Sequence, residues 1–313
     1  MNELTPLDRS KFRHPDITAD GSPRARVALE RLETLWFNTG TLCNLACANC
    51  YIESSPTNDR LAYLSHAEMV PYLDEIEALA LGTREIAFTG GEPFMNPEAI
   101  AMIETALTRG FEVLVLTNAM KPMRHKNDDM LRLRDRHGSR LRLRVSLDHH
   151  TSERHEEERG SGSWRPVIEG LTWLADNGFS VDVAGRRTFS EGEGEARQGY
   201  QDLFDEYAIP IDALNPARLI LFPEMAADTD VPEITEACWD ILGVRPVDQM
   251  CASSRMVVKR KGAAKPSVLS CTLIAYDEAF ELGTTLRDAT RPVSLNHPFC
   301  AQFCVLGGAN CSS

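Results

Sequence analysis

Three cysteines stand within eight residues of one another, at Cys43, Cys47 and Cys50. Nothing around them resembles a disulfide framework, and three thiolates so close together can converge on one soft metal centre. A [4Fe–4S] cluster normally takes four thiolates, so three would leave one iron open for another molecule to bind. We therefore expect an iron–sulfur centre with one exchangeable position in this loop.

A second group of cysteines lies towards the far end of the chain. Nine cysteines without a secretory signal favour metal or redox chemistry over disulfides. No cysteine lies between Cys50 and Cys238, so we expect the middle of the chain to be scaffold. Cys238 stands alone, and a lone cysteine is more often a small buried hydrophobe than a catalyst. The second group consists of Cys251, Cys271, Cys300, Cys304 and Cys311.

The composition is that of a globular protein with a substantial core, since 43% of the 313 residues are hydrophobic and 25% are charged. The 33 basic and 46 acidic residues give a net charge of −13. This balance disfavours nucleic acid and anionic membrane surfaces as partners, because both attract Lys and Arg. No apolar run approaches the roughly 18–20 residues of a membrane span, and the N-terminus lacks the apolar core of a secretory signal. We expect a cytoplasmic protein.

The elements that must position these residues alternate between strand and helix. Such a series predicts a parallel sheet with helices on its outer face, and right-handed crossovers curl it into a partial (β/α)6 barrel of the TIM type. The spacing of Ser65 and Glu68 predicts a capping box at the start of the first helix. We predict strands over residues 35–40, 84–89, 112–118, 141–148, 180–184 and 217–222. Helices are predicted over 65–82, 96–110, 126–137, 163–177 and 195–207.

Polar residues follow the predicted strands at the ends where a parallel barrel binds its ligands. The cysteine loop follows the first strand, and Gly90-Gly91-Glu92-Pro93 ends the second. We expect these segments to meet on one rim of the barrel. The other residues expected on this rim are Thr117, Asn118, Ser146, Asp148, Arg186 and Arg187.

The remaining residues form a lead-in, 1–34, and a C-terminal region, 223–313, on either side of a barrel that spans 35–222. We predict a short helix over 24–33 in the lead-in. In the C-terminal region we predict a helix over 232–242, a β-hairpin of strands 255–260 and 266–270, and a helix near 277–288. The expected fold is thus an α/β barrel with a small cysteine-rich hairpin-plus-helix extension.

With these features the chain resembles the radical S-adenosylmethionine (SAM) enzymes over residues 35–222. The resemblance rests on the C-x3-C-x2-C spacing of the first cysteine group and on Gly90-Gly91-Glu92-Pro93 at the end of the second strand. It implies a [4Fe–4S] cluster on the three cysteines, with SAM chelating the open iron through its amino and carboxylate groups. It also implies that the Gly-Gly-Glu-Pro segment holds the amino group of SAM.

The resemblance assigns further residues to SAM. Asn118 ends the third strand near the cofactor, and Ser146 and Arg186 approach its carboxylate or ribose. The family usually has an aromatic residue just before the third cysteine; here Asn49 stands there and Tyr51 follows the cysteine, so Tyr51 is the aromatic candidate. In this family a reduced cluster cleaves SAM to methionine and a 5′-deoxyadenosyl radical, which abstracts a hydrogen atom from the substrate. Flavodoxin or ferredoxin would supply the electron.

The C-terminal cysteines resemble the auxiliary-cluster extensions called SPASM and Twitch. Cys251-x10-Gly262-x8-Cys271 on the predicted hairpin looks like their opening, and Cys300-x3-Cys304-x6-Cys311 would complete it. A SPASM domain supplies seven cysteines for two clusters, whereas five here imply one auxiliary [4Fe–4S] cluster and one spare cysteine. Zinc held by four of these thiolates is the alternative. Zinc is disfavoured for the first group because no nearby His or Cys offers a fourth ligand.

The resemblance implies an oxidoreductase or epimerase that acts on a small molecule. The auxiliary cluster would accept an electron from the substrate or bind it, and Cys238 would donate a hydrogen atom, as lone cysteines do in some epimerases of the family. The alternative is a peptide-modifying enzyme of the same family. About 34 residues precede the first strand, too few for a leader-binding domain, so a separate recognition protein would be needed. A non-catalytic iron–sulfur or zinc scaffold would leave the Gly-Gly-Glu-Pro segment unexplained.

Two polar segments could be mistaken for functional sites. His149, His150 and His155 could form a ligand cluster, but the charged residues 153–159 beside them indicate a solvated loop. Residues 191–195 likewise indicate a mobile acidic loop.

Overall fold

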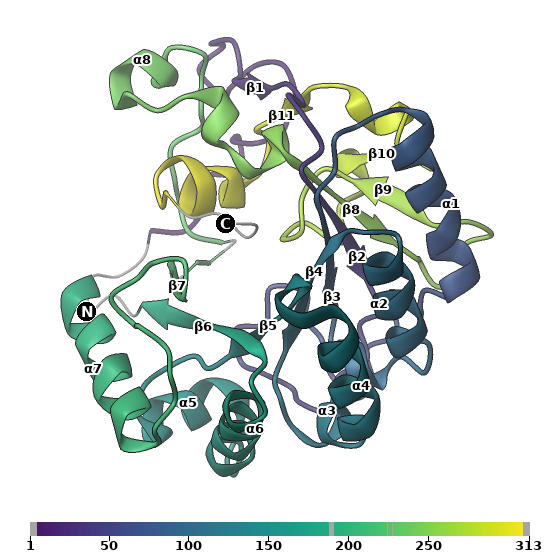
Figure 1. Ribbon diagram of the computed structural model, residues 1–313. Helices are drawn as coiled ribbons and strands as arrows, with labels where there is room; N and C mark the ends of the chain where they lie inside the picture. The colour runs from purple at the N-terminus through teal and green to yellow at the C-terminus, as the bar shows by residue number, and fades with distance from the viewer. Residues whose placement is uncertain (1–4, 188–190, 224, 227, 309–313) are drawn as a thin grey trace.

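A single curved sheet of nine strands organises the protein (Figure 1). The computed structural model describes residues 5–187, 191–223, 225–226 and 228–308. The strand order is β10-β9-β8-β2-β3-β4-β5-β6-β7, and every neighbouring pair from β2 to β7 is parallel. This arrangement confirms the predicted parallel sheet. The parallel strands are β2 (Thr34–Asn38), β3 (Glu85–Thr89), β4 (Glu112–Thr117), β5 (Leu141–Ser146), β6 (Ser180–Arg187) and β7 (Leu219–Pro223).

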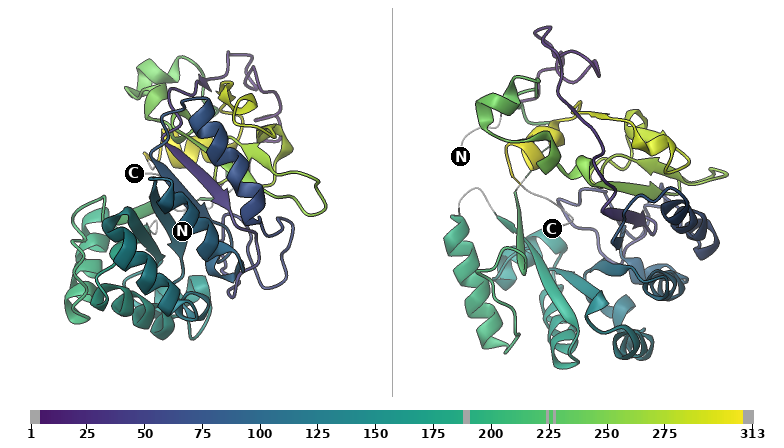
Figure 2. Two further views of the ribbon diagram at one scale, coloured as in Figure 1. Left: turned by 45° about the vertical axis from the view of Figure 1, so that its right-hand side comes forward. Right: turned by 45° about the horizontal axis from the view of Figure 1, so that its top comes forward.

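Helices cover the outer face of this sheet, as both views of Figure 2 show. The first helix begins with the predicted capping box, in which Ser65 and Glu68 satisfy each other's backbone amides. No helix in the described ranges is both long and apolar enough to cross a membrane. The helices around the barrel are α1 (His66–Ala78), α2 (Ala99–Thr108), α3 (Lys121–Arg124), α4 (Asn127–His137), α5 (Ser152–Arg159), α6 (Trp164–Asp176) and α7 (Glu193–Glu206).

Strand β5 shows how the sequence distributes side chains between the two faces of the sheet. Because successive side chains point to opposite faces, Leu141, Leu143 and Val145 all lie on one face, where they are fully buried in the core that the helices cover. Arg142 and Arg144 face the barrel interior together with Ser146, and they pair with acidic residues of β3 and β6. Ion pairs therefore fill the interior below the rim.

The C-terminal region joins the same sheet at one edge. Strand β8 (Ser254–Val258) pairs in parallel with β2, and β9 (Ser267–Leu269) pairs with β8 as the predicted antiparallel hairpin. Strand β10 (Glu281–Gly283) extends this edge. The pairing of β8 with β2 joins segments about 220 residues apart in sequence into one hydrogen-bonded ladder.

The other edge of the parallel sheet is covered by the π-helix η7 (Cys300–Val305). The ring centroids of Phe303 in η7 and Phe222 in β7 lie 5.4 Å apart. Gln302 adds two hydrogen bonds to the backbone of Ala226, of 2.8 and 3.0 Å. The C-terminal region therefore bridges the opening between β7 and β2 (Figure 1).

Three predicted helices are wrong in whole or in part. Residues 24–33 contain β1 (Arg26–Val27), which pairs with β11 (Val293–Ser294) instead of forming a helix. The helix expected over 232–242 is reduced to α8 (Cys238–Leu242), because the Ala25 amide bonds the Ile234 carbonyl at 2.9 Å. The helix expected near 277–288 is replaced by two short 3-10 turns and β10, since Gly283 has a φ of 131°.

Candidate functional site

A cavity opens at the carboxyl ends of the parallel strands. The three cysteines of the first group line it. Glu92 and Pro93 are buried and do not contribute to its wall. Six other residues expected at the cofactor site also line the cavity, namely Tyr51, Gly90, Gly91, Asn118, Ser146 and Arg186.

The cysteine loop offers its sulfurs to a metal centre that favours thiolates. Burial raises the pKa of the Cys43 thiol to about 12, so the isolated thiol stays protonated and a cationic centre would have to displace its proton. Backbone amides point at two of the sulfurs, from Leu45 to Cys43 at 3.4 Å and from Ser54 to Cys50 at 3.3 Å. Such N–H···S contacts stabilise thiolates bound to iron.

The donor set of this cavity favours a cluster over a single zinc ion. A structural zinc site takes four protein ligands. No histidine and no fourth cysteine is among the described residues that line the cavity. Three thiolates would therefore leave a zinc site incomplete, whereas a cluster with one open iron needs only three.

The Gly-Gly-Glu-Pro segment packs against the backbone that leads into the cysteine loop. A Cβ atom on Gly91 would lie 2.2 Å from the carbonyl oxygen of Leu42, and one on Gly90 would lie 2.5 Å from that of Gly40. Two backbone hydrogen bonds cross this contact, from the amides of Gly91 and Glu92 to the same two carbonyls. Glycine is required here because any side chain would separate the two segments.

Glu92 is a buried carboxyl group that lies behind Thr117 and Asn118 of the cavity wall. It accepts hydrogen bonds from the Thr117 hydroxyl at 2.9 Å, the Asn118 amide at 2.8 Å and the Phe94 amide at 3.2 Å. Burial nevertheless raises its pKa to about 7. A cationic group in the cavity would stabilise its ionised form.

Two arginines and one aspartate form a charged wall that the sequence-based expectations did not include as a unit. Arg159 donates to both carboxylate oxygens of Asp148, at 2.9 and 3.1 Å, and Arg186 lies 3.4 Å from the same group. Burial would raise the pKa of Asp148, but the two guanidinium charges outweigh it and lower that pKa. Because two cations face one anion, this wall can receive a further carboxylate. All three residues line the cavity.

Arg159 was missed because its helix was missed. Residues 153–159 are highly charged and lack an apolar stripe, so they predicted a solvated loop. In the structure they belong to α5, and His155 of that helix is fully buried against Trp164. The spacing of His155 and Arg159, one helical turn apart, is the signal that could have placed both on one helix face.

The cysteine loop is tied to α5 and β6 through the residue that precedes Cys50. The side-chain amide nitrogen of Asn49 lies 3.0 Å from both carboxylate oxygens of Glu158, and its carbonyl accepts a 2.6 Å hydrogen bond from Arg186. The guanidinium of Arg186 also lies 4.6 Å from the ring centroid of Tyr51. Tyr51 in turn donates to the carbonyl of Pro223 at 3.2 Å, which connects the loop to the end of β7.

Four cysteines of the C-terminal group line a second cavity with mainly apolar walls. Cys300 and Cys304 lie on the same side of η7, since a π-helix has about 4.4 residues per turn. The Leu273 amide donates to Cys271 at 3.4 Å, and Leu273 lines both cavities. Cys311 lies outside the described residues. The four cysteines that meet are Cys251, Cys271, Cys300 and Cys304.

Cys238 does not reach either cavity. It begins the short helix α8, where its sulfur accepts a 3.4 Å hydrogen bond from the Thr235 amide. The expected role as a hydrogen donor therefore has no geometric support.

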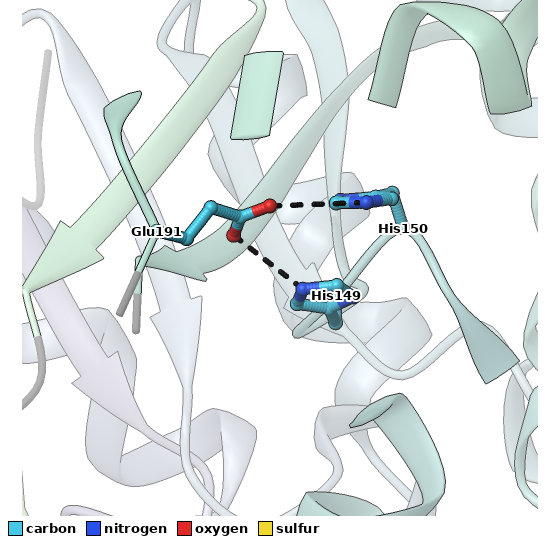
Figure 3. Close-up of side chains that lie close together, drawn as sticks. All are labelled: His149, His150 and Glu191. Carbon is cyan, nitrogen blue, oxygen red and sulfur yellow. Dashed lines mark ion pairs between the residues drawn. The ribbon is translucent and has the colours of Figure 1, made fainter. Parts of the chain in front are cut away.

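His149, His150 and Glu191 lie together beside the end of β5, as Figure 3 shows. The expectation of a solvated histidine loop is wrong, because His149 is buried and His150 is half-buried between Tyr200 and Gly199. The expected mobile acidic loop is also wrong for residues 193–195, which begin α7.

The hydrogen bonds of His149 disfavour a metal ion at its Nε2 atom. Its Nδ1 atom accepts a 3.0 Å hydrogen bond from the Thr151 amide, so the neutral ring carries its proton on Nε2. That Nε2 atom faces Glu191, 3.4 Å from a carboxylate oxygen. Burial lowers the pKa of His149 to about 4, which keeps the ring neutral near pH 7. Glu191 therefore covers the histidine pair through polar contacts.

Comparison with known proteins identifies the family to which this chain is similar. The profile of the Radical SAM superfamily matches residues 37–197. The antilisterial bacteriocin subtilosin biosynthesis protein AlbA of Bacillus subtilis is 34% identical over 183 residues, which cover 58% of this chain and 38% of AlbA. The AdoMet-dependent heme synthase of Oleidesulfovibrio alaskensis is 27% identical over 170 residues, covering 54% of this chain and 40% of that protein. The matches thus span about two fifths of these relatives.

The fold is also found in solved structures. The crystal structure of Streptococcus suis SuiB bound to S-adenosylmethionine superposes with a TM-score of 0.59, covering 81% of this chain and 63% of that chain. The sequences are 12% identical, so this likeness concerns the fold alone.

Proposed function

The chain belongs to the radical SAM superfamily, and from this premise we propose that it uses SAM to oxidise a peptide substrate through hydrogen abstraction. Family membership implies a [4Fe–4S] cluster and SAM. The donor set supports Cys43, Cys47 and Cys50 as the ligands, because their sulfurs line the rim cavity and receive backbone N–H groups. When bound and reduced, the cluster would supply the electron for cleavage of SAM to methionine and a 5′-deoxyadenosyl radical.

The residues around the cavity would orient SAM through complementary charge. Glu92 lies behind Thr117 of the cavity wall and would attract the amino group, while Arg159 and Arg186 would attract the carboxylate. Ser146 and Asn118 line the same cavity, and Tyr51 would limit its side next to β7. The apolar side chains of Trp36, Phe222 and Phe303 would keep water away from a reactive radical.

An auxiliary [4Fe–4S] cluster would occupy the second cavity. Four cysteines meet there, which is the full ligand set of such a cluster, so every iron would carry a thiolate and none would be open to substrate. Accepting an electron from the substrate is then the remaining role for this centre. Leu273 lines both cavities, which supports a short path between them. We therefore favour oxidation over epimerisation.

The peptide substrate is proposed from AlbA, the relative with the higher identity of the two, whose name assigns it to bacteriocin biosynthesis. The small-molecule substrate expected from the sequence is the second candidate, favoured by the similarity to a heme synthase. Deuterium transfer from labelled candidate substrates into 5′-deoxyadenosine would decide between them. An external electron donor such as flavodoxin or ferredoxin and a cytoplasmic location remain part of the proposal.

Anaerobic reconstitution tests the proposed function. We expect about eight irons per chain and formation of 5′-deoxyadenosine from SAM with dithionite. Cys43→Ser should abolish SAM cleavage and leave about four irons, because one cluster loses a ligand. Cys304→Ser should also leave about four irons but should retain SAM cleavage, and Cys238→Ala should change neither. A wild-type chain with about four irons would remove the auxiliary cluster, and no SAM cleavage would overturn the enzyme assignment.

A further inference from the structure

The side chain of Asn118 is fixed within the protein at both ends of its amide. Only 4% of the residue is exposed. Its Oδ1 atom accepts a 3.1 Å hydrogen bond from the Met120 amide, and this N–H fixes which end of the side chain carries the oxygen. The Nδ2 atom therefore points the other way, donating to Asn44 Oδ1 at 2.9 Å and to Cys43 Sγ at 3.9 Å.

The backbone that presents Asn118 is held in an unfavourable conformation. Ala119 has a φ of 57°, in the left-handed region that costs free energy for a residue with a Cβ atom. Two hydrogen bonds hold this turn, from the Ala119 amide to the Thr117 hydroxyl at 3.0 Å and from the Asn118 amide to Glu92 at 2.8 Å. Backbone strain that is maintained by its surroundings is typical of functional sites.

Helix α6 makes room for the same turn. A Cβ atom on Gly170 would lie 1.9 Å from the carbonyl oxygen of Ala119. The turn is thus confined by α6 on one side and by the Gly-Gly-Glu-Pro segment on the other. Both contacts keep the amide of Asn118 directed at the cysteine loop.

We propose that Asn118 is a positioning residue for Cys43, and that its N–H group raises the reduction potential of the cluster bound there. This inference rests on the proposed function. A hydrogen bond to a coordinating sulfur withdraws charge from it, which favours the reduced cluster. The amide of Asn118 is bonded to Met120, Asn44 and Cys43, and its expected contact with SAM stays a prediction.

The test compares one isosteric and one neutral substitution with a charge control. Asn118→Asp replaces the donor by an oxygen and adds a negative charge beside the sulfur, whereas Asn118→Thr removes the amide without adding charge. Asn215→Asp is the control, because Asn215 is exposed near the amino end of β7 and its Oδ1 acceptor role towards Ala217 is retained by aspartate. Each reconstituted chain is titrated anaerobically and followed by electron paramagnetic resonance.

The signal to follow is the one that changes when SAM is added, since it reports the cluster with the open iron. We expect Asn118→Asp to make one-electron reduction at least tenfold less favourable, which corresponds to about 59 mV. Asn118→Thr should shift the potential in the same direction by less, and Asn215→Asp should leave it unchanged.

An unchanged potential in both Asn118 variants, at equal iron content, would overturn the inference. If Asn118→Asp does not retain iron, the result with Asn118→Thr decides. The absence of any signal that responds to SAM would contradict the proposed function instead, so the two failures are distinguishable.

Discussion

At the scale of single residues, the site depends on two carboxyl groups whose ionisation is set by their surroundings. Glu92 is almost fully buried and has a pKa of about 7, while Asp148 is kept ionised by two arginines. Among the described residues no ion pair involves Glu92, whereas two arginines pair with Asp148. This asymmetry suits a ligand that carries an ammonium and a carboxylate on one carbon, as SAM does.

The raised pKa of Glu92 predicts a pH-dependent stability of the iron-free protein. Its pKa in the folded state is about 7, above the ordinary value of 4.5. The protonated Glu92 side chain therefore makes its full stabilising contribution below about pH 4.5. This contribution is lost as the pH rises through about 7, and the free energy of unfolding falls by about 3 kcal/mol. In Glu92→Gln the free energy of unfolding should not show this fall with rising pH. Denaturant unfolding at several pH values would measure it.

Glu112→Gln serves as the control, because Glu112 is exposed at the start of β4. It should leave the pH dependence of the wild type unchanged. Parallel curves for the wild type and Glu92→Gln would show that Glu92 does not titrate in this range. Glu92→Gln should also weaken SAM binding in the reconstituted enzyme, since a neutral amide cannot pair with the amino group.

At the scale of elements, helix α6 acts on the rim through a single glycine. Gly170 lets α6 approach the turn at Ala119, which leads to Asn118 and the cysteine loop. The predicted helix over 163–177 matched the observed Trp164–Asp176 because its apolar periodicity is local. That periodicity does not reveal the close contact between this glycine and the β4–α3 turn.

Substitution of this glycine should disturb both stability and the cluster. Gly170→Ala places a Cβ atom 1.9 Å from a backbone oxygen, so α6 or the turn must shift, and we expect a loss of about 1–3 kcal/mol in the free energy of unfolding. Iron bound by Cys43, Cys47 and Cys50 should fall as well. Denaturant unfolding and iron analysis would measure the two effects.

Gly194 provides a matched control within helix α7. A Cβ atom there meets nothing within 4 Å, so Gly194→Ala should stabilise the chain by about 0.5–1 kcal/mol through helix propensity. Equal effects of the two substitutions would show that the close approach at Gly170 is not important.

At the scale of the whole molecule, the C-terminal region covers both edges of the parallel sheet. Strand β8 pairs with β2 at one edge, and η7 packs on β7 at the other. The second cysteine cavity lies in this bridging region, so binding a cluster there would also fix the two edges relative to each other. Under the proposed function, one segment would thus both cover the rim cavity and hold the electron acceptor.

This arrangement predicts one cooperative unfolding transition for residues 35–222 and 223–313 together. Under anaerobic conditions, far-ultraviolet circular dichroism and the visible absorbance of the clusters should change at the same temperature. Phe303→Ala should lower that temperature for both probes, since Phe303 is fully buried and its loss costs about 3–5 kcal/mol. Two separate transitions, of which Phe303→Ala lowers only the earlier, would instead show that the regions unfold independently.

Much of the reaction type was determined by the sequence itself. The spacing of Cys43, Cys47 and Cys50 and the Gly-Gly-Glu-Pro segment indicated the family, and alternating strand and helix patterns predicted the parallel sheet. These signals are local, because a loop that binds one cluster and a strand that enters a core depend on residues close in sequence. The capping box at Ser65 is of the same kind.

Only the tertiary structure decided which distant residues meet. It placed Arg159 on the rim through a charged helix without an apolar stripe, and it brought four C-terminal cysteines to one cavity while leaving Cys238 outside. It also replaced the helix expected over 24–33 by the pairing of β1 with β11, whose residues are more than 260 positions apart. Such contacts gain their free energy from burial and hydrogen bonds between remote segments, and no pattern within either segment specifies its partner.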